Sequence, residues 1–143
     1  MQNLITAITS RVTTGPSSFY NDIGGRFYLD QAPDDTPRVF PDCIWLIVVD
    51  VPDNSFQKLG EEISIQFSLF SALPSVLEIT TMYADLKALF DDVKLTVTSS
   101  TMVIMKRERL VTFMEDVIVN TASNSTQRVK VWNVDYSITI QAN

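Results

Sequence analysis

The apolar residues of this chain change their spacing along the sequence in a definite order. Residues 3–12 carry apolar side chains at helical spacing, and the segment Ile23–Gln31 follows. Two strand patterns, a longer helical pattern and three further strand patterns come next. Helical spacing indicates one buried helix face, whereas a period of two indicates a half-buried strand. The order predicts an α+β fold: a mainly antiparallel sheet of about five to six strands with two helices packed on one face.

Two segments are predicted to be amphipathic helices. The first is short and stops at Gly15-Pro16, since both residues disfavour a continuing helix. The second opens at Pro74-Ser75 and ends near Asp92. Its apolar stripe should pack on the sheet, and it consists of Ile79, Met82, Leu86, Leu89 and Phe90.

The predicted strands differ in how they should be buried. Cys43–Val51 is a continuous run rich in β-branched residues, which predicts a central strand covered on both faces. Ile63–Leu69 alternates and predicts a half-buried strand, and a short strand is expected at Val93–Val97. The closing segment Val129–Ile140 changes the phase of its alternation, which predicts a bulge or a face switch near Trp132.

Four consecutive charged residues, Lys-Arg-Glu-Arg at 106–109, interrupt an apolar pattern. A turn at this place would need glycine or asparagine, and neither is present. We therefore expect one long strand from Met102 to Met114 whose charged middle lies on an exposed surface or at a subunit contact. A flexible polar loop is expected at Asn120–Gln127.

The chain contains no histidine and one cysteine. It therefore lacks the commonest general base and metal ligand, and no standard catalytic triad can form. Cys43 heads an apolar strand and is expected to be a buried, unreactive thiol. A weaker alternative is a divalent cation held by the adjacent Asp34 and Asp35. An enzyme is the least favoured class, and we predict no catalytic, cofactor or metal site.

At 143 residues the chain is long enough for one domain with its own core, predicted to span residues 1–143. No run approaches the roughly 18 apolar residues of a membrane helix, so no membrane partner is predicted. The first residues do not resemble a secretion signal, and we expect a protein that is made and used without export.

Charge is distributed unevenly along the chain. Residues 1–62 contain nine acidic and four basic residues, a net of −5, whereas residues 94–130 contain six basic and three acidic residues, a net of +3. This asymmetry suits head-to-tail docking of identical copies, although ordinary solvated faces would give the same pattern. The formal net charge of −6 argues against nucleic-acid binding as the main task.

The order of elements, together with residues 24–28 (Gly-Gly-Arg-Phe-Tyr), resembles the tail-completion proteins of tailed bacteriophages. In that family a short helix leads to a Gly-Arg-aromatic-Tyr segment, and a Pro-containing loop then enters a strand like Cys43–Val51. A helix like Val76–Phe90 and a strand with a basic segment like Met105–Leu110 follow. The likeness extends from Leu4 to Ile140.

The resemblance implies a tail terminator, a structural virion protein of the tail or neck that is made in the host cytoplasm. Six copies would form a homo-hexameric ring that caps the tail tube, ends its polymerisation and joins the tail to the head connector. The partners would be further copies, the tail tube protein and the head–tail connector or stopper protein. DNA would pass through the lumen without specific binding.

Subunit contacts are predicted in exposed loops and in the basic strand, where the acidic loop 30–42 of one copy would meet residues 106–109 of the next. The predicted interface residues are Asp34, Asp35, Phe56, Lys58, Lys106, Arg107 and Arg109. One alternative is another neck component (a stopper or head-completion protein) or a tail tube subunit. An alternative from a different class is a regulatory module that binds a small ligand or a peptide.

Overall fold

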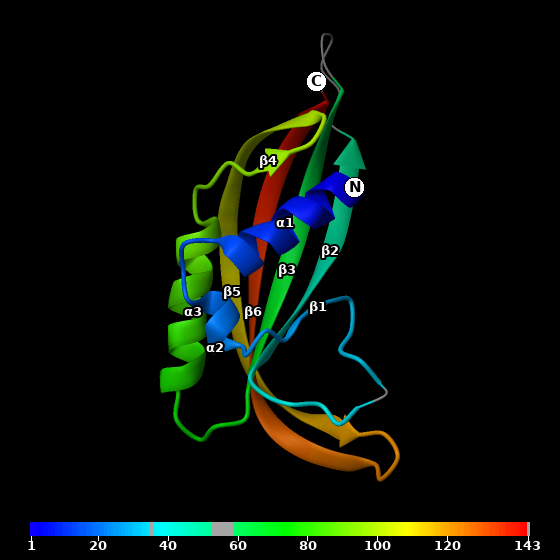
Figure 1. Cartoon of the computed structure of the whole chain (residues 1–143), viewed down its shortest axis with the longest axis vertical. Coiled ribbons are helices and arrows are strands. Elements are labelled where there is room, and N and C mark those ends of the chain that lie inside the picture. Colours follow the sequence, from blue (N-terminus) through cyan, green and yellow to red (C-terminus); the bar gives the residue numbers. More distant parts are fainter. Residues whose placement is uncertain (35, 53–58, 143) are drawn as a thin grey trace.

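The computed structural model describes residues 1–34, 36–52 and 59–142. Within them the element order is α1 (Gln2–Thr14), α2 (Phe19–Asp22), β1 (Phe27–Leu29), β2 (Asp42–Pro52), β3 (Gly60–Ser71), α3 (Leu77–Phe90), β4 (Thr96–Val97), β5 (Ser100–Asn120) and β6 (Ser125–Ala142). These strands form one sheet in the order β1-β2-β3-β6-β5-β4, with β1 parallel to β2 and every other described pair antiparallel. The predicted fold class is confirmed, and the helices lie on one face of the sheet (Figure 1).

The main core lies between this face of the sheet and the helices. The predicted stripe of α3 is buried throughout, and α1 buries Leu4, Ile8 and Val12. Phe67 of β3 lies at the centre, where its ring stacks on Phe90 with a centroid distance of 5.0 Å. Burial of so much apolar and aromatic surface is the dominant favourable contribution to folding.

The apolar run in β2 is covered on both faces only in its first part. Cys43 and Trp45 are buried in the main core, but Val48, Val49 and Val51 are exposed. The pairing of β2 with β3 shifts between Ile47 and Val49, so one extra residue turns the later valines away from the helices. The prediction of a central strand buried along its whole length was therefore wrong.

Two shorter elements also differ from the expectation. The predicted strand Val93–Val97 is reduced to an isolated bridge from Val93 to Met105 and to the two residues of β4. The expected loop Asn120–Gln127 is a tight turn, because β5 continues to Asn120 and β6 begins at Ser125. The long strand through the charged segment is confirmed as β5.

The face of β6 that is buried changes near Trp132, as predicted. No bulge accompanies this change in the pairing of β6 with β3. The β3–β6 register runs without a shift from Gly60–Gln141 to Ser71–Lys130. Beyond Trp132 towards the hairpin, the buried residues Val129 and Val131 join a second core on the opposite face of the sheet. The segment before β2 reaches this core through Phe40.

Candidate assembly surface

The interior of the main core contains one thiol. Cys43 is fully buried, and burial followed by the charge of Asp42 raises the pKa of its thiol well above the ordinary value. The thiol therefore stays protonated and is a poor nucleophile. In the part of the chain that the structure describes, no three histidine, cysteine, aspartate or glutamate side chains gather into a possible metal site.

No helix in the described residues is long and apolar enough to cross a membrane.

The face of the sheet away from the helices carries a row of polar side chains that bond to one another. Gln66 Nε2 of β3 donates a hydrogen bond to Asp135 Oδ1 of β6 at 2.9 Å. One step along, Ser68 Oγ donates to Asn133 Oδ1 at 2.7 Å. Arg109 Nε of β5 bonds the other oxygen of Asp135 at 2.5 Å. Three strands are thus linked across this open face by side-chain hydrogen bonds.

The open face is hollowed. Val48 and Val49 of β2 line the same hollow, of about 450 Å³, as Glu108 and Arg109 of β5. Strands β3 and β6 lie between them, so a flat sheet would hold these side chains about 14 Å apart. The shared lining therefore indicates that the open face is concave.

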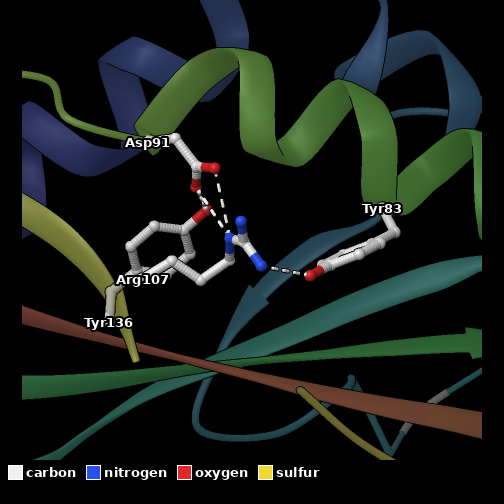
Figure 2. Close-up of polar contacts among 4 residues, drawn as sticks. All are labelled: Tyr83, Asp91, Arg107 and Tyr136. Atoms are coloured by element: carbon white, nitrogen blue, oxygen red, sulfur yellow. Dashed lines mark hydrogen bonds and ion pairs between the residues drawn. The ribbon is translucent and has the colours of Figure 1, made fainter. Parts of the chain in front are cut away.

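Arg107 lies on the helix side of the sheet in a polar cluster with two tyrosines and Asp91 (Figure 2). Its Nε is 3.1 Å from Asp91 Oδ2, and its guanidinium donates to Tyr83 Oη at 2.7 Å. Tyr136 Oη donates to Asp91 Oδ1 at 2.6 Å. Burial, and then this bond to Asp91, raise the pKa of Tyr136, so the phenol keeps its proton. The cluster ties the end of α3 to β5 and β6.

A bulge in β5 places the two neighbouring arginines on opposite faces. Arg107 pairs with Tyr136 and Arg109 with Asp135, so two steps along β5 match one step along β6. Arg109 consequently points to the open face, where its side chain is 71% exposed. Lys106 is also exposed. The expected exposure of the basic segment is confirmed, whereas its role in a subunit contact stays a prediction.

The predicted acidic loop is held against the far end of the β5–β6 hairpin. Arg38 N–H donates to the carbonyl of Val119 at 2.7 Å, and Thr121 Oγ1 to the carbonyl of Asp34 at 3.5 Å. Asp34 is exposed. Asp42 is fully buried and paired with Arg38, so it cannot contribute to an acidic surface. Predicted interface residues Asp35, Phe56 and Lys58 lie outside the described residues.

Sequence reasoning missed the partners of both arginines. Asp91 and Tyr83 are 16 and 24 residues from Arg107 along the chain, and Asp135 is 26 residues from Arg109. No local spacing links them, since the contacts depend on the register of β5 against β6 and α3. An acidic residue at the end of a helix before a basic strand was the only available signal.

Comparison with models of known protein families and with characterised proteins finds no match. Among solved structures, a chain of the virion of a native gene transfer agent (GTA) particle is similar in fold, with a TM-score of 0.66. The superposition covers 96% of this chain and 93% of that chain, at 10% sequence identity. At this identity the likeness establishes a shared fold.

Proposed function

We propose that this protein is a structural component of a phage-like virion, and more specifically a tail terminator. The observation that carries the proposal is the match in fold to a chain of the GTA virion, because it extends over nearly all of both chains. A match of this extent favours a common role for the whole domain more than a shared substructure does. The resemblance of residues 24–28 and of the element order to tail-completion proteins supports the finer assignment.

The surface of the molecule suits a protein that acts by assembly. The buried thiol is protonated, the open face is concave and carries a polar row, and exposed charges lie on one long strand. In the proposed mechanism a ring of six copies covers the last ring of the tail tube and prevents further subunits from adding. Its other side then receives the connector of the filled head, and no covalent step is involved.

Native mass spectrometry over a concentration series, with and without magnesium, tests the ring. We expect a hexamer, and we expect negatively stained tail tubes from the same virion to carry the protein at one end only. Growth of the isolated protein into tubes would identify a tube subunit instead. A monomer that ignores tube ends and melts at a higher temperature with a small ligand would support the binding-module alternative.

Charge reversal tests the contribution of the basic strand. Arg109→Glu should weaken ring formation while the fold is kept, because its side chain is mostly in solvent. Arg107→Glu should also weaken it, but that change breaks the ion pair with Asp91 as well. Circular dichroism and thermal melting must therefore accompany the assembly measurement. Normal rings from the double variant would exclude this strand as a charged contact.

A further inference from the structure

Both long edges of the sheet are largely without a partner strand. On β5, β4 covers Ser100 and Thr101, and Met105 N–H donates to the carbonyl of Val93. From Lys106 to Ile118, no strand among the described residues pairs with its outer edge. On the other side β1 covers Cys43–Trp45, and within the described residues Leu46–Pro52 has no outer partner. Such rows of backbone N–H and C=O groups are ready to accept another strand.

These edges are not simply protected against aggregation. Charged residues and bulges are common protective devices, and residues 106–109 fit that role. The remaining edge residues do not, because many of them are apolar and exposed. On β5 these are Val111, Phe113 and Met114, which are 42–47% exposed, and on β2 they are Val48, Val49 and Val51, which are 44–52% exposed.

The directions of the two edges are suited to pairing, and their open stretches overlap in level. Strands β2, β3, β6 and β5 are joined by three successive antiparallel pairings, so β2 and β5 run in opposite directions. A second copy related by rotation about a ring axis that runs along the strands would therefore bring its β2 antiparallel to β5 of the first. Val49 is linked through Ser64 and Ser137 to Lys106 in one cross-strand row, and Leu46 is linked in the same way to Arg109. The two open stretches thus share these levels of the sheet and extend from them in opposite directions.

The charges beside the two edges are opposite. Asp50 at the β2 edge is exposed, and so are Glu61 and Glu62 on the adjacent β3. The β5 edge begins with Lys106 and Arg107. Because Met105 is already engaged by Val93, an incoming strand must lie on the hairpin side of it, beside the basic residues. Such complementary charges favour this pairing and its orientation.

We propose that the copies of the ring meet by edge pairing, with β2 residues 46–52 of one copy antiparallel to β5 residues 106–118 of the next. The inference rests on the proposed ring and names the surface through which its members join. The shorter edge, roughly 23 Å, fits within the longer one, roughly 43 Å. The acidic partner of the basic segment is then the β2–β3 end, and not the loop 30–42.

Disulfide trapping tests the pairing directly. Val49→Cys is combined in turn with Lys106→Cys, Arg109→Cys or Val111→Cys, which lie on the open face of β5. A disulfide within one chain leaves a species of monomer size, so a ladder of larger species arises only from links between copies. Cys43 is buried and can stay. In the matched control, Asp50→Cys replaces Val49→Cys, because adjacent residues of a strand point to opposite faces.

Under mild oxidation we expect a ladder of linked species on a non-reducing gel for Val49→Cys with one of the three partners, and none for Asp50→Cys. The reactive partner would fix the register. Hexamers without any Val49→Cys ladder, or an equal ladder from the control, would overturn the edge pairing and leave the ring intact. A ladder from Asp34→Cys with Lys106→Cys alone would support the loop arrangement. Monomers that also fail to bind tube ends would overturn both proposals.

Discussion

The two cores of this molecule are stabilised by different kinds of interaction. The core under the helices is apolar and aromatic, with Phe67 between Trp45 and Phe90. The second core, on the opposite face, is small and contains an ion pair, Arg38–Asp42, whose members are 13% and 0% exposed. A large core can rely on buried apolar area, whereas a small one next to a loop needs directional polar contacts to fix it.

The largest loss of stability is expected when a side chain at the centre of the main core is removed. Phe67→Ala should destabilise the protein by about 4 kcal/mol, because it removes a fully buried ring and leaves a cavity. Denaturant unfolding measures the change. Phe113→Ala on β5, where the ring is 42% exposed, is the control and should cost far less. Equal losses of stability from the two variants would contradict the placement of Phe67 at the centre of the main core.

The second core should depend on its arginine. Arg38 bonds Asp42 through two nitrogens, at 2.8 and 3.0 Å, and lies over the ring of Phe70 at 4.2 Å. Arg38→Ala should destabilise the protein by about 3 kcal/mol, because a buried carboxylate is left without a counter-charge. The double variant with Asp42→Asn should recover part of this loss. Hydrogen exchange should show faster opening of the hairpin end than of α3.

A carboxyl pair beside the main core gives a smaller, pH-dependent effect. Burial, then a hydrogen bond shared with Asp85 and its charge, raise the pKa of Asp22 to about 7. The folded protein thus binds a proton more tightly than the unfolded chain, and this stabilisation is lost as the pH rises from about 4 to about 7. Asp22→Asn should remove that slope.

At pH 8 the Asp22→Asn variant should exceed the parent protein in stability by about 1 kcal/mol, a figure reduced for the partial solvent exposure of the site. The difference should vanish near pH 4. Thermal melting of both proteins from pH 4 to 8 provides the measurement. If the melting temperatures of the two proteins changed with pH in parallel, a proton shared between Asp22 and Asp85 would be contradicted.

The smallest effect is expected on the open face. Arg109→Ala breaks an ion pair with Asp135, but the arginine side chain is 71% exposed and Gln66 still bonds the carboxylate. Exposed pairs contribute little to stability. The denaturation midpoint should therefore not change measurably. A clear loss of stability would mean that the polar row supports the fold, as the second core does.

Much of the fold followed from spacing, while the details depended on long-range register. The stripe of α3 and the continuous β5 were predictable because their patterns are local. The exposure of Val49 was not, since a bulge that changes the facing of β2 carries no glycine to mark it. The ion pair of Arg107 with Asp91 depends on where α3 ends against β5. The predicted interface residues remain a prediction.

The three register shifts between β5 and β6 have a geometric consequence. At each one, between Met102 and Met105, Arg107 and Arg109, and Ile118 and Asn120, β5 has one residue more than its partner. Over the paired length its path exceeds that of β6 by about 10 Å at 3.3 Å per residue. Two ribbons of unequal length, joined along their whole edge, cannot lie straight. The bend of the hairpin end (Figure 1) thus accompanies a difference in arc length between the two paired strands.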